Sequence, residues 1–235
     1  LTKQYASKRA VNNVSLSIQE GELFALLGVN GAGKTTLIKM LSCLTKPTSG
    51  DALLFGKSII TEPQQVKQLI AVSPQETAIA PNLTVRENLE LMAGVHGFNK
   101  EKTKLKTDEL IHKFSLQPFE KQRSKTLSGG WKRRLSIAMA LISEPKILFL
   151  DEPTLGLDVL ARRELWTVIE QLKQTTTIIL TTHYLEEAEA LADRICIMKD
   201  GQIKAIGSAS ELIEKANVTR FEDAFIKFVS DGDGE

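Results

Sequence analysis

Hydrophobic and polar residues alternate near the start of the chain and then give way to a continuous apolar run. Val11, Val14, Leu16 and Ile18 are separated by polar positions. This period of two predicts a strand with one solvated face, and so an antiparallel start to the fold. The run Leu23–Leu27 that follows is typical of a parallel strand that is buried on both faces.

Apolar residues then recur at the spacing of an amphipathic helix. They predict a helix over Thr36–Leu44, which ends at the Pro- and Gly-containing segment 46–50. Short apolar runs predict further strands over Ala52–Phe55 and Leu69–Val72. From about residue 76 to residue 142 the pattern is helical, and we interpret this region as a helical insertion in an α/β core. Its best candidate helices are Val85–Ala93, Lys102–Phe114 and Leu135–Ile142.

The alternation of strands and helices resumes after this insertion. The predicted elements are strands over Ile147–Leu150 and Thr177–Thr181, helices through Leu165–Leu172 and Leu185–Leu191, and a hairpin of Arg194–Met198 with Gln202–Ile206 around an Asp-Gly turn. The polar tail 231–235 is predicted to be disordered. The whole pattern predicts an α/β fold with a parallel sheet, an antiparallel β region at the N-terminus and a helical subdomain inserted over about residues 76–142.

The charge balance narrows the class of protein. Lys and Arg number 30 against 29 Asp and Glu, a formal net charge of +1, with a Lys-rich patch over residues 100–106. A nucleic-acid-binding protein would show a basic stripe or a strongly raised isoelectric point, so no nucleic-acid partner is expected. No apolar run approaches the ~18 to 20 residues of a membrane span, and no signal-peptide pattern opens the sequence.

The two cysteines, Cys43 and Cys196, both lie in apolar segments. We interpret them as reduced core residues of a cytosolic protein rather than a disulfide or a metal pair. The sequence does not begin with Met, so we expect further residues upstream of it.

Residues 28–35 read Gly-Val-Asn-Gly-Ala-Gly-Lys-Thr and match G-x-x-x-x-G-K-[ST] between a predicted strand and a predicted helix. Such a loop turns backbone N–H groups toward one anion, and the following helix adds its partial positive charge. Lys34 can then reach the outer phosphates of a nucleotide, and the Thr35 hydroxyl can hold Mg²⁺. The alternative is a glycine-rich turn that binds nothing, and the flanking strand and helix argue against it.

Two carboxylates follow the apolar run Ile147–Leu150. Asp151 suits Mg²⁺ and its water shell, and Glu152 can activate an attacking water. Hydrolysis of a phosphoanhydride needs a phosphate cradle, a metal ion and one oriented base. A solvated strand end is the alternative, but a buried strand that leads to the carboxyl edge of a parallel sheet argues against it.

A third motif, Leu127–Trp131 (Leu-Ser-Gly-Gly-Trp), opens a predicted helix whose first turn carries Lys132, Arg133 and Arg134. Cations at the positive end of a helix dipole are unfavourable unless an anion docks there. We therefore interpret this helix start as a second phosphate-reading N-terminus.

The three motifs follow one another along the chain as Gly28–Thr35, Leu127–Trp131 and Ile147–Glu152. In this order and spacing they resemble the motifs of the nucleotide-binding subunit of an ATP-binding cassette (ABC) transporter. The similarity covers nearly the whole chain, and the Ser-Gly-Gly signature is far more specific than the phosphate loop. The resemblance implies the ABC ATPase fold on a P-loop NTPase core, with residues 1–217 as the nucleotide-binding domain and 218–235 as a C-terminal extension. It implies ATP and Mg²⁺ as cofactors, and it assigns to ATP the residues Asn30, Gly31, Ala32, Gly33, Lys34, Thr35, Thr36, Ser128, Gly129 and Gly130.

The resemblance also assigns roles to single residues. Tyr5 matches the aromatic that stacks on adenine, with an ordinary strand aromatic as the alternative. Gln75 matches the glutamine that contacts Mg²⁺ and hinges the insertion, and Asp158 lies in the loop that crosses a dimer interface. His183 matches the histidine that contacts the γ-phosphate and orients Glu152, with a surface or capping histidine as the alternative. The implied catalytic residues are Glu152, His183, Gln75 and Lys34, and the implied metal ligands are Thr35, Gln75 and Asp151.

One position departs from the family pattern. The signature usually ends in Gln, and here it ends in Trp131. The Ser128 hydroxyl and the glycine amides are retained, so phosphate binding is expected to survive. Any contact that the glutamine side chain makes to the ribose or to a partner chain is put in doubt.

The resemblance implies a motor subunit that hydrolyses ATP, forms a homodimer and drives a separate transmembrane permease from the cytoplasmic face of the membrane. Thr84–Leu89 and Phe221–Phe225 resemble segments of drug-resistance and sodium-efflux export ATPases, and residues 77–89 are expected to edge the groove for the permease. Two alternatives stay open. One is a soluble ABC ATPase that acts in translation or on DNA, and the other is a nucleotide-binding scaffold without hydrolysis.

Overall fold

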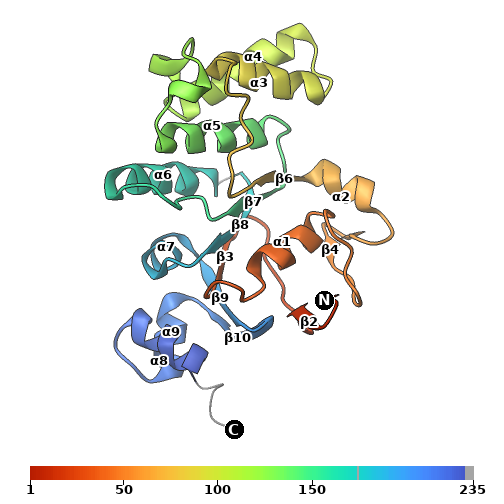
Figure 1. Ribbon diagram of the computed structural model, residues 1–235, viewed down its shortest axis with the longest axis vertical. Helices are drawn as coiled ribbons and strands as arrows, with labels where there is room; N and C mark the ends of the chain where they lie inside the picture. Colours follow the sequence, from red (N-terminus) through yellow and green to blue (C-terminus); the bar gives the residue numbers. More distant parts are fainter. Residues whose placement is uncertain (174, 231–235) are drawn as a thin grey trace.

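The computed structural model describes residues 1–173 and 175–230, and a mixed six-stranded sheet forms its centre (Figure 1). The strands lie in the order β10–β9–β3–β8–β7–β6. Neighbouring strands are parallel except for β9 and β10, which form the predicted antiparallel hairpin. The bounds are β3 Leu23–Leu27, β6 Ile70–Ser73, β7 Ile147–Asp151, β8 Thr177–Thr182, β9 Arg194–Lys199 and β10 Gln202–Gly207.

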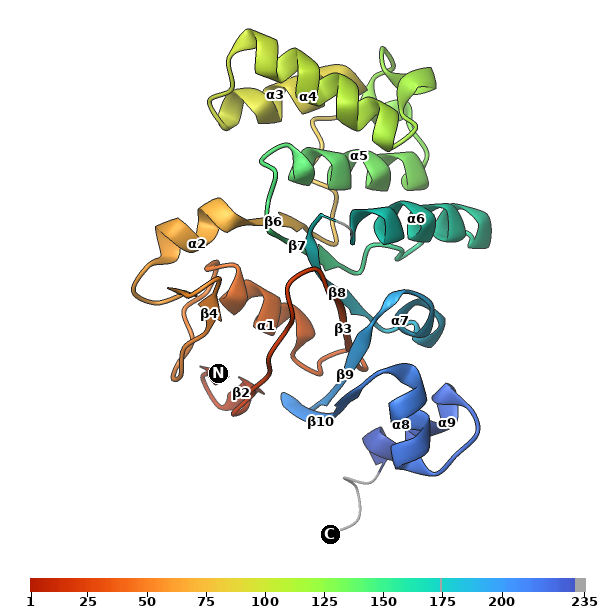
Figure 2. The same cartoon turned by 180° about the vertical axis from the view of Figure 1, so that it is seen from behind.

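Helices cover both faces of this sheet (Figures 1 and 2). Two of them, α1 and α2, lie on one face, whereas α5, α6 and α7 lie on the other. The pair α8 and α9 packs together against β9, β10 and α7. The bounds are α1 Lys34–Leu41, α2 Pro63–Leu69, α5 Gly129–Leu141, α6 Val159–Leu172, α7 Leu185–Leu191, α8 Ala209–Ala216 and α9 Phe221–Ser230.

The central strands are apolar throughout because their side chains alternate between the two layers of helices. In β7, Ile147 and Phe149 pack in the cluster beneath α1, whereas Leu148 and Leu150 pack in the cluster beneath α5 and α6. All residues of β3 are buried, so the prediction for Leu23–Leu27 is confirmed. The α/β class predicted from the sequence is confirmed as well.

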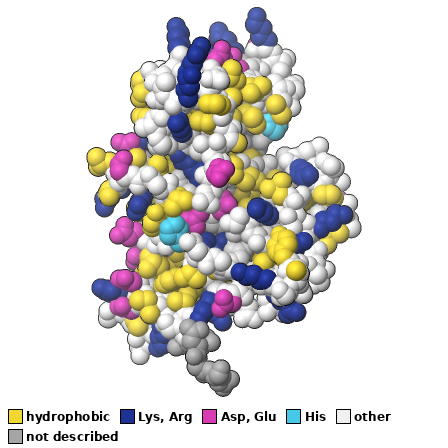
Figure 3. Space-filling view, in the orientation of Figure 1, with side chains coloured by type: hydrophobic (Ala, Val, Ile, Leu, Met, Phe, Trp, Pro, Cys, Tyr) yellow, Lys and Arg dark blue, Asp and Glu magenta, His cyan; other side chains and the backbone are white. Residues whose placement is uncertain are grey.

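The inserted region forms a separate layer of helices at the top of Figure 1. It contains α3 (Val85–Val95) and α4 (Lys100–Lys113), which pack against each other and against α5. A capping box begins α3, because the Thr84 side chain accepts from Glu87 N while the Glu87 carboxylate accepts from Thr84 N. Lys and Arg side chains project from this end of the molecule (Figure 3). The predicted helices are confirmed, although α5 begins at Gly129 rather than at Leu135.

The N-terminal region is antiparallel, as predicted, but less regular than predicted. It contains the pairs β1 (Lys3–Tyr5) with β2 (Lys8–Val11) and β4 (Leu53–Leu54) with β5 (Lys57–Ser58). The strand expected over residues 11–18 is wrong, because β2 ends at Val11.

Apolar and polar residues alternate in the segment beyond β2, although this segment does not pair with a neighbouring strand. Val14 is buried and its N–H donates to Leu1 O at 2.9 Å, while Ser15 is exposed. Leu16 and Ile18 pack against the cluster beneath α1. One-sided packing of an extended segment therefore produced the period of two.

A second correction concerns the first helix, which ends at Leu41 and not at Leu44. Cys43 takes a left-handed φ of 56°, which no helix can continue, and Leu44 is exposed. Both cysteines are free, and burial raises the pKa of the Cys196 thiol to about 12. The helices α2 and α8 were not predicted.

No described helix is long and apolar enough to cross a membrane. The tail predicted to be disordered, residues 231–235, lies outside the described residues. The predicted boundary between residues 217 and 218 falls just after α8, where Asn217 takes a left-handed conformation with φ of 53° and caps the helix. That division stays a prediction, because α9 packs back onto β9 and β10.

Candidate functional site

The loop between β3 and α1 forms one wall of a cleft of about 450 Å³. Gly33 precedes α1 with φ of 104°, and a Cβ atom there would collide with the carbonyl oxygen of Ala10. This position therefore requires glycine. The cleft brings together most of the residues that the resemblance assigned to nucleotide and metal, namely Tyr5, Asn30, Gly31, Ala32, Gly33, Lys34, Thr35, Thr36, Gln75, Glu152 and His183.

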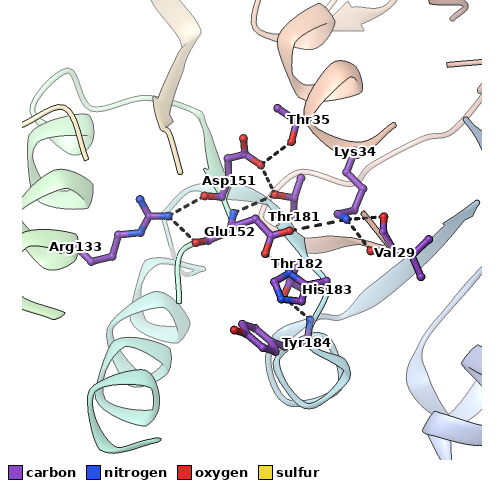
Figure 4. A network of polar contacts seen from close by, with 11 residues as sticks. Val29, Lys34, Thr35, Arg133, Asp151, Glu152, Thr181, Thr182, His183 and Tyr184 are labelled. Carbon is purple, nitrogen blue, oxygen red and sulfur yellow. Dashed lines mark hydrogen bonds and ion pairs between the residues drawn. The ribbon is translucent and has the colours of Figure 1, made fainter. Parts of the chain in front are cut away.

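The Lys34 ammonium is held inside the loop that precedes it. It donates to the carbonyl oxygens of Gly28 at 2.6 Å and Val29 at 3.3 Å, and it lies 3.8 Å from Glu152 Oε1 (Figure 4). Burial lowers the pKa of Lys34 from its ordinary value, and the charges of Glu152 and Asp151 oppose that shift. The Lys34 ammonium thus lies at the cleft, paired with one carboxylate and two carbonyl oxygens.

Asp151 ends β7 and collects hydroxyl groups from two neighbouring elements. Thr181 Oγ1, on β8, donates to Asp151 Oδ1 at 2.5 Å, and Thr35 Oγ1, on α1, donates to the same oxygen at 3.3 Å (Figure 4). Asp151 is buried. One carboxylate, a hydroxyl group and the nearby Gln75 form an all-oxygen donor set of the kind that suits Mg²⁺.

No group of three or more His, Cys, Asp and Glu side chains in the described part of the chain is placed to hold a metal ion. Mg²⁺ retains several waters and binds through one or two carboxylates together with the phosphates of its nucleotide.

Glu152 lies between the lysine and a histidine. Its Oε2 is 2.6 Å from His183 Nδ1, and its backbone N–H donates to Thr181 O at 3.1 Å (Figure 4). The residue is buried and takes a left-handed φ of 50°, which is uncommon for a residue with a side chain. The turn after β7 therefore holds this carboxylate in a fixed place at the cleft.

Arg133 joins this network, although no such role is predicted for it from the motifs. The side chain is 4% exposed and donates to the carbonyl oxygens of Asp151, Glu152 and Pro153, each at 2.7 Å. It also donates to the carbonyl oxygens of Pro74 and Gln75. One signal in the sequence could have indicated that Arg133 is buried. Arg133 lies three and four positions before Ser136 and Ile137, which are buried on the same helix.

Two of the three cations at the start of α5, Arg133 and Arg134, have partners within the chain. Arg133 points inward as described, and Arg134 Nη2 donates to Glu164 Oε2 at 2.7 Å. The expectation that these two arginines wait for a docking anion is therefore wrong. The interpretation of Ser128–Gly130 as a phosphate-reading helix start stays a prediction.

Asp151 does not line the cleft itself but accepts from Thr35, which does. The other assigned residues outside the cleft are Ser128, Gly129, Gly130 and Asp158. They form a second group, because a Cβ atom on Gly129 or Gly130 would contact Leu157 or Ala161. The Asp158 carboxylate caps α6 by accepting from Ala161 N at 2.9 Å. Among the described residues, the Ser128 side chain makes no capping bond to α5.

Trp131, which replaces the usual glutamine, is engaged within its own chain. Its ring centroid lies 4.5 Å from that of Phe119, and the Arg134 guanidinium lies over the ring at 4.5 Å. These contacts give the indole a packing role at the start of α5.

Comparisons with known proteins agree with the motifs. A sequence profile of the family described as "ABC transporter" matches residues 11–155. The doxorubicin resistance ATP-binding protein DrrA of Mycobacterium tuberculosis is 41% identical over 211 residues, which cover 89% of this chain and 64% of that protein. The phospholipid-transporting ATPase ABCA3 of Mus musculus is much longer. It is 40% identical over 208 residues, which cover 88% of this chain and 12% of that protein.

Two solved structures share the fold over most of the chain. One, described as "Structure of ATP binding subunit of ABC transporter", has a TM-score of 0.85 at 28% identity, covering 97% of this chain and 96% of that chain. The other is described as the "Dimeric structure of a post-hydrolysis state of the ATP-binding cassette MJ0796 bound to ADP and Pi". Its TM-score is 0.78 at 27% identity, covering 88% of this chain and 95% of that chain.

Proposed function

Because this chain belongs to the ABC transporter family, we propose that it is a subunit or domain that binds and hydrolyses ATP to drive transport, in an exporter of the drug-resistance type. The convergence of Lys34, Asp151, Glu152 and His183 on one cleft carries this proposal. Similarity to a drug-resistance ATP-binding protein supports the exporter type. The transported compound is left open.

In the proposed nucleotide complex, the backbone amides of residues 30–35 surround the β- and γ-phosphates at the start of α1. Tyr5, which is 46% exposed at the rim of the cleft, stacks on the adenine. The Lys34 ammonium leaves its carbonyl partners to contact the outer phosphates. Thr35, Asp151 and Gln75 would hold Mg²⁺, which would supply positive charge to neutralise the phosphates.

Glu152 is the proposed base for the attacking water. The carboxylate accepts a proton from that water as the water approaches the γ-phosphate. His183 fixes the carboxylate through Nδ1, which must carry the hydrogen because both carboxylate oxygens are acceptors. In the neutral ring this tautomer leaves Nε2 as an acceptor for a water, and only the protonated ring, with a hydrogen on both nitrogens, can also donate to a γ-phosphate oxygen.

The site is proposed to be shared between two chains. Ser128–Gly130 and Asp158 lie outside the cleft of their own chain, and a two-fold dimer would bring them to the nucleotide of the partner. The dimeric form of a related cassette with ADP and Pi supports this arrangement. Exposed Leu155, Val159 and Leu160 lie next to Asp158, on a surface that such a dimer would cover.

The proposal extends to a transmembrane permease, which is either a separate subunit or a fused part of a longer protein. We propose that residues 77–89, which lead from the Gln75 loop into the first part of α3, edge the groove that receives it on the cytoplasmic face of the membrane. The division into a nucleotide-binding domain over residues 1–217 and an extension from residue 218 belongs to the same proposal.

Phosphate release by the purified chain tests the central claim. We expect ATP turnover that requires Mg²⁺ and rises with protein concentration as dimers form. Binding of ATP without any phosphate release, at concentrations where dimers are present, would favour a nucleotide-binding scaffold. Turnover with no association with a membrane fraction of the native host would favour the soluble ATPase.

A further inference from the structure

Arg133 is enclosed in the protein, and within the described residues its hydrogen bonds all go to main-chain carbonyl oxygens. Its Nε and Nη2 groups donate to the carbonyl oxygens of Asp151, Glu152 and Pro153, which form the turn after β7. A guanidinium group has five N–H donors in a planar fork, and this fork matches converging carbonyl oxygens well. One side chain thus binds three successive carbonyls.

The same guanidinium reaches a second loop. Its Nη1 donates to the carbonyl oxygens of Pro74 and Gln75, the latter at 3.3 Å, directly after β6. The strands β6 and β7 are neighbours in the sheet, so their two following loops lie side by side. Arg133 therefore ties together the loops that hold Glu152 and Gln75.

The charge of Arg133 persists at neutral pH despite its burial. Desolvation lowers the pKa of Arg133 to about 10, and the carboxylates of Asp151, Glu187 and Glu152 oppose the shift. The cation thus complements a cluster of negative groups and the negative ends of carbonyl dipoles. A neutral amide at this position could not do so.

The turn that carries Glu152 needs such support. Its left-handed conformation is disfavoured for a residue with a side chain, and such conformations persist only where surrounding contacts impose them. Arg133 binds the carbonyl of Glu152 and the carbonyls on both sides of it. The backbone N–H of Glu152 donates to both the carbonyl oxygen and the hydroxyl oxygen of Thr181.

We propose that Arg133 is a positioning residue that holds the Glu152 turn and the Gln75 loop in place and connects both to the start of α5. The helix start at Ser128–Gly130 lies one turn before Arg133 on the same helix. A shift of that helix start must therefore move the guanidinium and, through it, the two loops. This inference rests on the proposed ATPase function, in which the helix start reads the nucleotide of the partner chain.

The first test compares nucleotide affinity with turnover in the full chain. Arg133→Gln removes the charge and most donors without touching the phosphate loop, so we expect the Kd for ATP to change by less than about 3-fold. The turnover number should fall by about 10- to 100-fold, because a misplacement of about 1 Å in a catalytic group has effects of that size. Arg133→Lys should recover only part of the loss, because an ammonium cannot serve both loops.

Arg134→Gln is the matched control. It removes a second buried arginine from the same helix, one whose hydrogen bond is to Glu164 and not to the site. Losses that Arg133→Gln shares with this control belong to helix stability. Equal turnover in the two variants would overturn the proposal.

A double-variant cycle shows whether Arg133 acts through Glu152. If it does, adding Arg133→Gln to Glu152→Gln should lower the remaining turnover by less than about 3-fold, since the base is already absent. A structural role alone predicts that the two losses multiply. A multiplied loss would overturn the positioning role.

Hydrogen exchange separates this inference from the proposed function. The Leu155 N–H donates to Glu152 O within the turn, at 3.2 Å. In the nucleotide-free chain, Arg133→Gln should raise amide exchange in residues 151–157 by about 10-fold or more, whereas Arg134→Gln should not. A parent chain without ATPase activity would remove the proposed function only. Unchanged exchange in Arg133→Gln would remove the positioning role itself.

Discussion

His183 Nδ1 lies 2.6 Å from Glu152 Oε2, and this contact joins side chains that follow two neighbouring parallel strands. Glu152 follows β7 and His183 follows β8, 31 positions later in the chain. Because the carboxylate can only accept, the histidine ring is oriented and its tautomer is set. The two residues therefore form one unit, and substitutions in either are expected to act on the same step.

Substitution of the base should separate chemistry from binding. Glu152→Gln keeps the size of the side chain but cannot accept a proton from water, so hydrolysis is expected to fall by about 10²- to 10⁴-fold, the usual effect of losing a general base. ATP affinity should remain near that of the parent. Lys34→Ala is the contrasting variant, which should weaken ATP binding because it removes the cation that meets the phosphates. Nucleotide titration and steady-state turnover check both expectations, and near-parent hydrolysis by Glu152→Gln would remove Glu152 from this role.

Trp131→Gln restores the residue that the family signature usually has. The indole contacts Phe119 and Arg134 of its own chain, so the substitution should retain much of the turnover while lowering stability by about 0.5–1.5 kcal/mol, the range for an aromatic pair. Turnover and the midpoint of urea unfolding are the measurements. A collapse of turnover with unchanged unfolding would show that the indole makes a specific contact across the nucleotide site.

Glu187 should make stability depend on pH. Its side chain is fully buried in α7, where it accepts from Trp166 Nε1 at 3.1 Å, and burial raises the pKa of the carboxyl above its ordinary value of 4.5. As pH rises from that ordinary value through the raised one, the folded chain holds a proton that the unfolded chain has lost. Stability attributable to Glu187 therefore falls with rising pH across this window.

The variant Glu187→Gln removes this titration. Relative to the parent, it should gain stability as pH rises above the ordinary carboxyl value, as measured by the free energy of unfolding in urea across a pH series. Glu186→Gln is the control, because Glu186 is the exposed neighbour on the same helix. A difference between Glu187→Gln and the parent that stays constant across the pH series would show that the carboxyl does not titrate with a raised pKa.

Mixed dimers test the shared site. Lys34→Ala subunits mixed with Ser128→Arg subunits should form dimers in which one of the two nucleotide sites keeps an intact phosphate loop and an intact signature. A chain that carries both changes, mixed with parent subunits, leaves no complete site in the mixed dimer. Phosphate release in each mixture is measured after mixed dimers are confirmed, for example by a size tag on one subunit.

Phosphate release in the two mixtures decides between a site that is shared by two chains and a site within one chain. The shared site predicts that the first mixture exceeds both single variants, with a partial rescue if the two sites cooperate. Activity in the second mixture but not in the first would mean that each chain handles ATP alone.

The glycine-rich loop between β3 and α1, the Asp151–Glu152 pair after β7 and the alternation of strands and helices from β7 to β10 could be predicted from the sequence. Each of these features is determined by residues that are close together in the sequence. Apolar runs and helical spacing determine which segments can be buried, and glycine at position 33 permits the left-handed φ that starts α1. The convergence of β3, β7 and β8 then follows from the rule that parallel strands end at one edge of a sheet.

The tertiary structure decided what depends on long-range contacts. A pattern of apolar residues could not show that residues 14–18 pack as an extended segment without a strand partner. The sequence also could not show that Arg133 turns inward, because an arginine at a helix start is equally compatible with solvent, an anion or buried carbonyls. Only the approach of β6 and β7 beside α5 places those carbonyls together, and the cost of leaving them without donors is what directs the side chain.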